Sequence, residues 1–390
     1  MSKESSSATL TEVNPPASVE DDVHAHWQRV VGRRSFLKGV GLAGAAALPG
    51  SALFTGEAFA RSRSVTDGDI AILRFLAAAE LIESDLWTQY NELGGVNGRN
   101  PAYMLALENL DSDMPQYIAD NTDDEISHAR FLNAYLRSQG ADPVNLDAFR
   151  TLPSSKATGA KQIGRLTNLK ALNVDTSWYV RYRSTLNPDL GAKFPQAVTI
   201  RNQPAIPLTD ADTPPTLMAP VPPVGPQENR MQAIANTAGF HFAFIEQGGS
   251  SLYSTMALKA SSLEVLRIVV SIGGVETNHF SLWHDKAGNA VSPPLAGVTD
   301  PETHLTFPNL NAHPTALTQT NLILPEPCEF LRKDLPLCSV VRPTLDKNAG
   351  AVAAVKGLTA DQLFKGQSPR FFSTLMRLAK AADAAQRHVV

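Results

Sequence analysis

The feature that most constrains this chain is a Glu-x-x-His pattern that occurs twice, at residues 125–128 and 276–279. Residues three apart lie on the same face of an α-helix, because one turn takes 3.6 residues. A carboxylate and an imidazole held side by side on a helix form a ready pair of metal ligands. No other Glu-x-x-His occurs in the 390 residues, so two copies in helix-like segments favour a metal site over chance.

Composition narrows the classes of protein that fit this chain. Its 390 residues are enough for one large domain or two ordinary ones, and a hydrophobic content of 43% is ample for a core. The formal net charge of −4 gives no basic surface, so a nucleic-acid partner is not expected. The two cysteines, Cys328 and Cys338, form no Cys-x-x-Cys pair, which argues against a zinc ribbon or a redox pair. They form either a disulfide or two buried thiols.

The first sixty residues are typical of an export signal that is removed from the mature protein. Residues 32–38, GRRSFLK, resemble a twin-arginine motif, in which paired arginines precede a large apolar residue and often a lysine. The apolar stretch 39–54 is too short and too rich in glycine to span a membrane, and residues 58–60, AFA, match an A-x-A cleavage site. We expect cleavage after Ala60, a periplasmic or secreted protein, and no membrane attachment afterwards. The alternative is a basic linker with an accidental Arg-Arg pair.

Four long segments carry apolar residues at the three-and-four spacing of an α-helix. They are expected at about residues 67–93, 114–138, 228–259 and 262–285. In the first segment Asp67 or Asp69 is the expected N-cap, and the pair 94–95, Gly-Gly, ends the helix. A shorter helix is expected near residues 101–110.

Two glycine pairs lie about one turn from acidic residues inside the third and fourth helical segments, at 248–249 and 273–274. Glycine costs about 1 kcal/mol relative to alanine in a helix interior. Four such residues therefore indicate that neighbouring helices approach closely at these points.

The rest of the chain is expected to be mostly irregular. Residues 141–227 contain ten prolines in their second half, and proline lacks the backbone donor that regular elements need. A helical pattern at 160–172 is the exception. Residues 287–390 form a second proline-rich, extended segment, which closes with a helix at about 359–388 that Thr359 caps.

The four helical segments form two similar pairs. In the first pair Glu80 precedes Trp87 by seven residues, and a Glu-x-x-His follows. In the second pair Glu246 precedes Tyr253 by the same distance, and a Glu-x-x-His follows again. This arrangement resembles the ferritin-like di-metal carboxylate family. The segments AAELIESDLW, FIEQGGSSLY and GGVETNHFSLW look most like the exported ferritin-like-domain branch, over about residues 67–286.

The resemblance implies an all-α protein with a ferritin-like four-helix bundle over residues 61–286. Residues 141–227 would be the long crossover inserted between the second and third helices, and residues 287–390 an irregular extension that ends in a helix. A homo-oligomer is a further expectation, for which the sequence itself gives no signal.

The resemblance also implies a site for two iron or manganese ions. These metals suit ligands rich in carboxylate oxygen and poor in nitrogen, whereas zinc prefers four ligands with more nitrogen or sulfur. The implied roles are terminal carboxylates, bridging carboxylates and one histidine for each metal. The terminal carboxylates would be Glu80 and Glu246, and the bridging carboxylates would be Glu125 and Glu276. The histidine ligands would be His128 and His279.

Residues around the implied ligands differ between the two halves. In bacterioferritin-like relatives an Asp just before the Glu-x-x-His glutamate accepts a hydrogen bond from the metal-bound histidine across the bundle. Asp124 occupies this place in one half and Val275 in the other. Glu83 is the alternative ligand of the first helix. His241 is expected to be a core or gate histidine, and Tyr253 is expected in the core. His284 is expected to be exposed.

The leading hypothesis is a di-iron or di-manganese protein that reacts with dioxygen or peroxide outside the cytoplasm. An oxidase or peroxide-removing role ranks above substrate hydroxylation. The alternative is a non-enzymatic exported stress or structural protein, on the same scaffold, whose metal site is lost or vestigial. A storage-cage ferritin ranks third, because the insert and the tail would crowd a closed shell. Metal content discriminates the first two hypotheses.

Overall fold

The computed structural model describes most of the chain after the expected export signal. The described residues are 65–182, 195–212, 227–312, part of 325–340, and 350–388. The export signal expected at residues 1–60 and Cys328 lie outside them. The described residues are mostly helical, which confirms the all-α fold predicted from the sequence. Among the described helices, none is long and apolar enough to cross a membrane.

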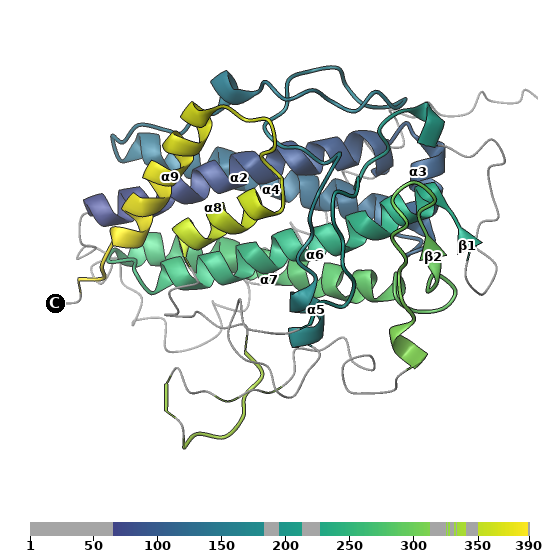
Figure 1. The fold of residues 1–390 in the computed structure, drawn as a ribbon. Helices are drawn as coiled ribbons and strands as arrows, with labels where there is room; N and C mark the ends of the chain where they lie inside the picture. Colours follow the sequence, from purple (N-terminus) through teal and green to yellow (C-terminus); the bar gives the residue numbers. More distant parts are fainter. Residues whose placement is uncertain are drawn as a thin grey trace, which may run out of the picture. The chain divides into compact units, whose positions relative to one another are not determined.

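Four long helices form the bundle (Figure 1). They are α2 (Asp67–Gly94), α4 (Met114–Ser138), α6 (Arg230–Ala257) and α7 (Leu263–Asn289). Helix α2 packs against α4, and α6 packs against α7, so each half of the bundle is a pair of helices close in sequence. The largest difference from the predicted boundaries is at the end of α7, which continues past Asp285 to Asn289. The short helix α3 (Pro101–Glu108) lies between α2 and α4 in the chain, as predicted.

Local sequence determines where α2 begins and ends. Thr66 is the N-cap: its hydroxyl accepts the Asp69 N–H at 3.1 Å, and the Asp69 carboxylate accepts the Thr66 N–H at 3.0 Å. The prediction that Asp67 or Asp69 caps the helix is therefore wrong, because Asp69 closes a capping box from inside the first turn. Gly95 is the C-cap, so the predicted end of the helix is confirmed.

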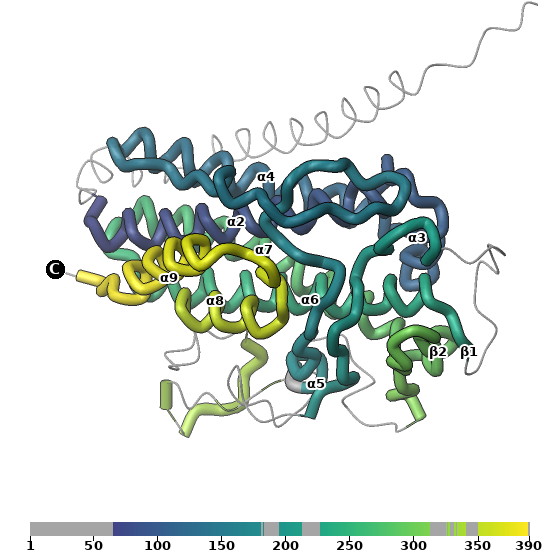
Figure 2. The backbone as a smooth tube through the Cα atoms, turned by 45° about the horizontal axis from the view of Figure 1, so that its top comes forward, coloured from purple at the N-terminus to yellow at the C-terminus, as the bar shows by residue number. Residues whose placement is uncertain are grey.

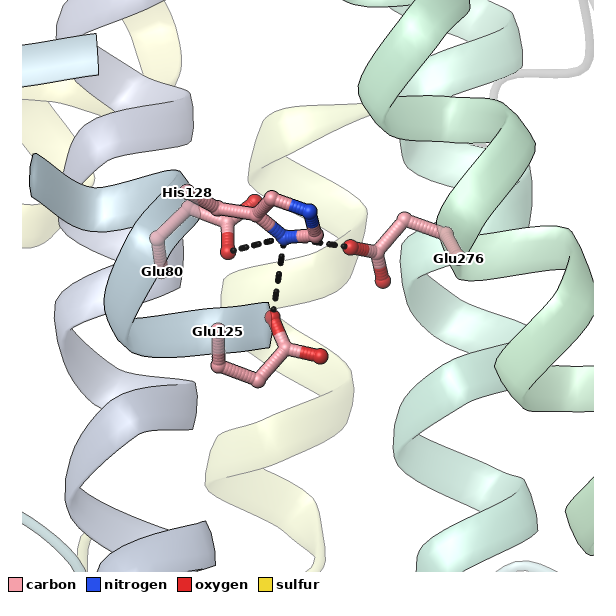
Figure 3. A group of neighbouring side chains, drawn as sticks. All are labelled: Glu80, Glu125, His128 and Glu276. Carbon is pink, nitrogen blue, oxygen red and sulfur yellow. Dashed lines mark hydrogen bonds and ion pairs between the residues drawn. The ribbon is translucent and has the colours of Figure 1, made fainter. Parts of the chain in front are cut away.

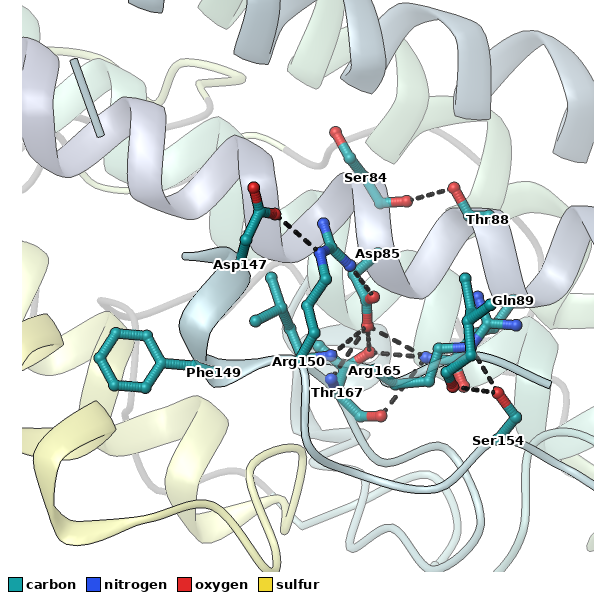
Figure 4. Close-up of polar contacts among 12 residues, drawn as sticks. Ser84, Asp85, Thr88, Gln89, Asp147, Phe149, Arg150, Ser154, Arg165 and Thr167 are labelled. Carbon is teal, nitrogen blue, oxygen red and sulfur yellow. Dashed lines mark hydrogen bonds and ion pairs between the residues drawn. The ribbon is translucent and has the colours of Figure 1, made fainter. Parts of the chain in front are cut away.

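The crossover between α4 and α6 is held on α2 by Asp85 (Figure 4). The Asp85 carboxylate accepts the N–H groups of Leu166 at 3.0 Å and Thr167 at 2.9 Å. It also pairs with the Arg150 guanidinium at 2.6 Å. These amides donate to a side chain on another element, and residues 160–172 contain no helix. The helix predicted there is wrong for this reason.

Two further groups of ion pairs fasten the crossover. Arg165 pairs with Glu92 of α2 at 2.5 Å. Arg230, at the start of α6, pairs with Asp300 at 2.5 Å and with Asp212 of the crossover at 3.1 Å. Because both arginines are buried with their partners, the crossover is docked onto the bundle rather than extended from it.

Short elements complete the crossover and the segment after α7. Helix α5 (Ser177–Tyr182) buries Trp178 against Phe240 of α6 and Phe280 of α7. Strand β1 (Gln227–Glu228) pairs in parallel with strand β2 (Val298–Thr299). Among the described residues there are also three single-turn 3-10 helices, which are η2 (Asp147–Phe149), η3 (Asp210–Asp212) and η4 (Leu310–Ala312).

The C-terminal part forms two helices where one was predicted. They are α8 (Ala351–Ala360) and α9 (Pro369–Ala384), which pack against each other, α9 against α2 and α8 against α6 (Figures 1 and 2). Thr359 lies inside α8, and the N-cap of α9 is Ser368, whose side chain accepts the Phe371 N–H. Pro369 at the first position of α9 lacks the amide that a continuous helix would use, which explains the break. Cys338 is exposed, which contradicts the alternative of two buried thiols.

Helix α6 is the most enclosed element, because α7, α3, α8 and β2 all pack against it. Most of its side chains are buried, including the carboxylate of Glu246. A charged group in such a place needs a partner, since an isolated buried charge is very costly.

Candidate metal centre

All four bundle helices direct predicted ligands toward one centre. The structure brings all six together: Glu80 from α2, Glu125 and His128 from α4, Glu246 from α6, and Glu276 and His279 from α7. The four glutamates are fully buried, while the two histidines keep 7% and 6% of their surface exposed. The histidines therefore mark the side of the centre that is nearest to solvent.

One half of the centre is built around His128 (Figure 3). Its Nδ1 lies 3.3 Å from Glu80 Oε2 and 3.3 Å from Glu125 Oε2. The same nitrogen lies 3.4 Å from Glu276 Oε1. Three carboxylates from three helices thus converge on a single imidazole nitrogen.

The other half is built around His279. Its Nδ1 lies 3.1 Å from Glu125 Oε1 and 3.3 Å from Glu246 Oε2. Each half has four residues whose potential ligand atoms lie within 4.8 Å of one another. Glu125 and Glu276 belong to both groups, so these two carboxylates stand between the two histidines.

Five ligand-type atoms of this centre have no hydrogen-bond partner among the described residues. They are Glu80 Oε2, Glu246 Oε2, both carboxylate oxygens of Glu276, and His279 Nδ1. Glu80 Oε2 and Glu276 Oε1 lie 3.3 and 3.4 Å from His128 Nδ1, and Glu246 Oε2 lies 3.3 Å from His279 Nδ1, all without the geometry of a hydrogen bond. A buried polar atom without a partner costs roughly 1–3 kcal/mol, so such atoms are rare and need an explanation. Five around one point fit a site that cations complete.

Charge crowding changes the pKa values of these groups. Burial raises the pKa of Glu125 to about 7, and the neighbouring Glu246 carboxylate adds to the rise. Burial and the Glu125 carboxylate hold the pKa of Glu276 well above its ordinary value. Burial alone would lower the pKa of His128, but the surrounding carboxylates outweigh it and raise the pKa to about 12. In the metal-free protein, protons therefore supply the positive charge that four glutamates require.

The supporting contacts of the two histidines differ, as the sequence predicted. His279 Nε2 lies 3.1 Å from Asp124 Oδ2, across the bundle, which confirms the predicted contact of Asp124. Val275 stands in the corresponding place for His128 and offers no polar group. Within the part of the chain that the structure describes, only the His279 half therefore has a carboxylate that fixes its imidazole from behind.

Two polar residues that hold the carboxylates were not identified from the sequence. The Asn121 amide donates to Glu125 Oε1 at 2.8 Å and to Glu246 Oε1 at 3.1 Å. Tyr253 was expected in the core, where it lies, but its hydroxyl also donates to Glu80. Asn121 stands one turn before Glu125 on the ligand face of α4, and this spacing is the signal that could have identified it.

The prediction that neighbouring helices approach closely at all four paired glycines is confirmed at one glycine of each pair. A Cβ on Gly249 would overlap the Glu276 carboxylate, and one on Gly273 would come within 2.8 Å of Tyr253 Cβ. Gly248 and Gly274 face open space, so close helix approach explains one glycine of each pair. Gly249 thus provides the room that the Glu276 carboxylate occupies.

The remaining candidate residues lie outside the two four-residue groups. Glu83 is half-buried, and burial together with the charges of the four buried glutamates raises its pKa. His241 lies in the core as predicted, with its Nδ1 2.7 Å from the Tyr90 hydroxyl, and burial lowers its pKa to about 3. His284 is fully buried against Trp178, so its predicted exposure is wrong: α5 of the crossover covers it.

Comparison with known proteins agrees with this geometry. A family model described as a ferritin-like domain matches residues 68–289, more than half of the chain. The match begins in the first turn of α2 and ends at the last residue of α7, so it spans all six candidate ligands. The comparisons with curated proteins and with solved structures found no match.

Proposed function

Because the chain belongs to the ferritin-like domain family, we propose that its buried cluster binds two iron or manganese ions. The observation that carries this proposal is the pair of four-residue groups that share Glu125 and Glu276. This overlap supports two metal positions that share two carboxylates. The set of donors, four carboxylates and two imidazoles, suits iron or manganese better than zinc.

Each ligand has a role that follows from its place in the cluster. The shared carboxylates would bridge the two metals, the others would each bind one, and each imidazole would bind through Nδ1. The bridging ligands would be Glu125 and Glu276, and the terminal carboxylates would be Glu80 and Glu246. The imidazole ligands would be His128 and His279. When bound, the metal pair supplies a two-electron change of oxidation state to an oxidant at an open coordination position.

The neighbouring side chains orient these ligands. Tyr253 donates to Glu80, Asn121 donates to two of the carboxylates, and Asp124 holds the His279 imidazole. The rings of Trp87 and Phe242, with centroids 4.8 Å apart, lie fully buried in the bundle core and exclude water there. Such supporting contacts keep ligand geometry fixed while metal charge changes.

The reaction partner we propose is dioxygen or peroxide. The two described pockets lie at the N-terminal end of α2 and include none of the six ligands. The four glutamates are fully buried, so a small oxidant suits the centre better than a bulky organic substrate. An oxidase or peroxide-removing role therefore ranks above hydroxylation.

Export by the twin-arginine route remains part of the proposal. Residues 32–38 support it through their sequence alone. Replacing Arg33 and Arg34 together by Lys should leave the precursor in the cytoplasm. Unchanged export and cleavage of that double variant would refute this route and the periplasmic or secreted location that depends on it.

One observation favours the alternative, a non-enzymatic exported stress or structural protein on a ferritin-like scaffold. The two imidazoles lie 3.1–3.4 Å from the carboxylates, so protonated histidines could balance part of the buried charge without metal. In that arrangement both carboxylate oxygens of Glu276 still have no hydrogen-bond partner among the described residues, which argues against it. Metal content decides between the two.

The test is elemental analysis of the mature protein after anaerobic reconstitution with iron(II) or manganese(II). We expect about two ions per chain, as the ligand set of this family provides. The variant Glu125→Ala serves as the reference with a damaged centre. Iron and manganese at trace level in the unaltered protein would refute the di-metal proposal and leave the scaffold role.

A further inference from the structure

The end of helix α8 meets the crossover at a joint made of hydrogen bonds to backbone carbonyl groups (Figure 2). The Asn173 N–H donates to the carbonyl oxygen of Asp361 at 2.9 Å. The side-chain amide of Asn173 donates to the carbonyl oxygen of Ala360 at 3.3 Å. Close by, the Asn168 N–H donates to the carbonyl oxygen of Leu363 at 2.7 Å. The crossover and the turn after α8 therefore lie side by side at this joint.

The Asp361 carboxylate at this joint is buried without a partner. The residue keeps only 5% of its surface exposed, and its Oδ2 has no hydrogen-bond partner among the described residues. A carboxylate in such a place is costly unless another group balances its charge. Asp361 is also the C-cap of α8, where the free carbonyl groups of the last turn carry partial negative charge. Burial and position therefore both call for a positive partner.

A second carboxylate, that of Asp175, faces the same joint. The even-numbered residues of 172–176 are buried, and Asn173 and Asp175 between them are half-buried. This alternation is that of an extended chain, in which residues two apart share a face. Asp175 therefore lies on the face of Asn173, which contacts the end of α8. Burial and the Asp175 carboxylate raise the pKa of Asp361 to about 8, in keeping with two acids close together.

We propose that Asp361 and Asp175 bind a calcium ion that ties the crossover to the end of α8. Calcium prefers carboxylate oxygens, and its flexible coordination accepts carbonyl oxygens and waters at the remaining positions. The ion supplies the partner that Asp361 Oδ2 requires, at a helix C-terminus where cations are stabilised. Neither aspartate belongs to the two four-residue groups of the bundle, so this site is separate from the proposed metal centre.

A proton on Asp361 is the alternative to a cation, and it explains less. It would remove the charge, but the buried Oδ2 would still lack a hydrogen-bond partner. Asp300, which is also buried, shows how side chains of this protein balance such an acid: its Oδ2 accepts both the Arg230 guanidinium and the Gln203 amide. No such donor reaches Asp361 Oδ2 within the part of the chain that the structure describes.

The calcium ion would fasten the C-terminal helices to the rest of the protein. Helix α8 packs against α6, and α9 packs against α2, so this pair of helices covers two members of the bundle. The site takes only two carboxylates from the protein, and we expect a dissociation constant of about 0.1–1 mM, the range of calcium sites in extracellular modules. Calcium at this concentration would therefore control how firmly α8 stays attached to the crossover.

The experiment measures thermal unfolding of the mature protein in calcium chloride and in magnesium chloride at equal ionic strength. We expect about 10 mM calcium to raise the melting temperature by about 2 °C or more. Magnesium should do less, because it demands octahedral geometry and gives up water reluctantly. Asp361→Asn and Asp175→Asn should lose the response to calcium. Asp142→Asn, an exposed acid of the crossover, and Glu276→Ala in the bundle should keep it.

Hydrogen exchange gives a local readout of the same site. Calcium should slow exchange of the Asn173 amide by about ten-fold or more in the unaltered protein, but not in Asp361→Asn. The Val144 N–H, which donates to Asn133 Oδ1 elsewhere in the crossover, is the internal control and should not change.

Three results would overturn the calcium site. The first is a calcium response that survives in both Asp361→Asn and Asp175→Asn, and the second is an equal response to magnesium. The third is an Asp361→Asn protein that melts above the unaltered one while calcium changes neither, which would make Asp361 a buried neutral acid. Absence of bound iron and manganese would refute the proposed metal centre and leave the calcium site intact.

Discussion

The two halves of the bundle contain the same candidate ligands in different surroundings. Helices α2 and α4 supply a Glu and a Glu-x-x-His, and α6 and α7 supply the same set at the same spacing. The residues behind them are not the same. Asp124 and Asn121 of α4 correspond in position to Val275 and Ile272 of α7, and Glu83 of α2 corresponds to Gly249 of α6.

This difference shows that each half of the bundle depends on supporting residues from the other half. Asp124 belongs to α4 but supports His279 of α7, and Tyr253 belongs to α6 but donates to Glu80 of α2. Neither helix pair therefore holds a complete site, although each carries three ligands. The two proposed metal positions should also differ in affinity, because among the described residues only the His279 imidazole has a carboxylate behind it.

Removing a shared carboxylate should have the largest effect on this arrangement. Glu276 belongs to both four-residue groups, so Glu276→Ala should weaken both metal positions and uncouple the two ions. The remaining carboxylates would repel one another across a wider gap, since less cation charge holds them together. Metal analysis and the magnetic signature of a bridged pair measure the result, with Glu264→Ala, an exposed acid on α7, as control. A bridged signature that survives in Glu276→Ala would contradict the shared role.

The second prediction concerns the glycine that replaces Glu83 in the other half. In Gly249→Ala the added Cβ overlaps the Glu276 carboxylate, so we expect the loss of at least one metal ion. Gly248→Ala is the matched control, because nothing lies within 4 Å of its Cβ. Alanine favours the helix by about 1 kcal/mol at either position. Equal metal content in both variants, measured by elemental analysis, would show that Glu276 moves aside without cost.

A pH titration tests whether the two halves form one charge cluster. In the metal-free protein the pKa of Glu125 is raised from 4.5 to about 7 and that of His128 from 6.5 to about 12. Both groups keep in the folded state a proton that the unfolded chain releases. Their contribution to stability is therefore present at low pH and declines as pH rises through these windows.

We expect the melting temperature of the metal-free protein to fall between about pH 5 and about pH 9. Metal binding requires the deprotonated ligands, so the loaded protein should lack this decline over the same range. Thermal unfolding of both forms across the range checks the sign. A melting temperature of the metal-free form that rises with pH would contradict the raised pKa values.

The fourth prediction weakens one metal position only. Asp124→Asn keeps the size of the side chain but removes the carboxylate that holds His279. We expect the affinity of the His279 position to fall by about 10–100-fold, and that of the His128 position to change little. Asp123→Asn, an exposed neighbour on α4, is the control. A metal titration that resolves two binding phases measures both affinities, and an equal loss in both phases would refute the assignment.

The same comparison explains how much of the site could be predicted from the sequence. Ligands repeat at fixed spacing, so Glu125, His128 and their counterparts stand out on helices whose period is known. Asn121 shares that face, but an isolated amide carries no pattern of its own. Tyr253 was interpreted as core because its aromatic ring fits the apolar spacing, and only the folded bundle shows that its hydroxyl contacts a ligand of another helix.

Some parts of the fold could likewise be predicted from the sequence, and others could not. The long helices were predicted to within a few residues, because their apolar periodicity is strong and local caps end them. The conformation of the crossover was not predicted, since it depends on partners far away in the chain. One such partner is Asp85, which accepts the amides of Leu166 and Thr167. The burial of His284 was missed for the same reason: its cover, α5, lies about a hundred residues earlier in the sequence.

The smallest effect is expected at Glu83, where the first half carries an acid and the second half carries Gly249. Glu83 belongs to neither four-residue group and is only half-buried, so Glu83→Gln should keep two metal ions. It removes a negative charge that acts on the centre from one turn away, and affinity should fall by less than about ten-fold, the effect of 1.4 kcal/mol. Glu80→Gln is the comparison, because Glu80 lies in the His128 group and should lose the metal there. If Glu83→Gln loses more metal than Glu80→Gln, Glu83 is the ligand of α2, and the two halves differ in their ligands as well as in their support.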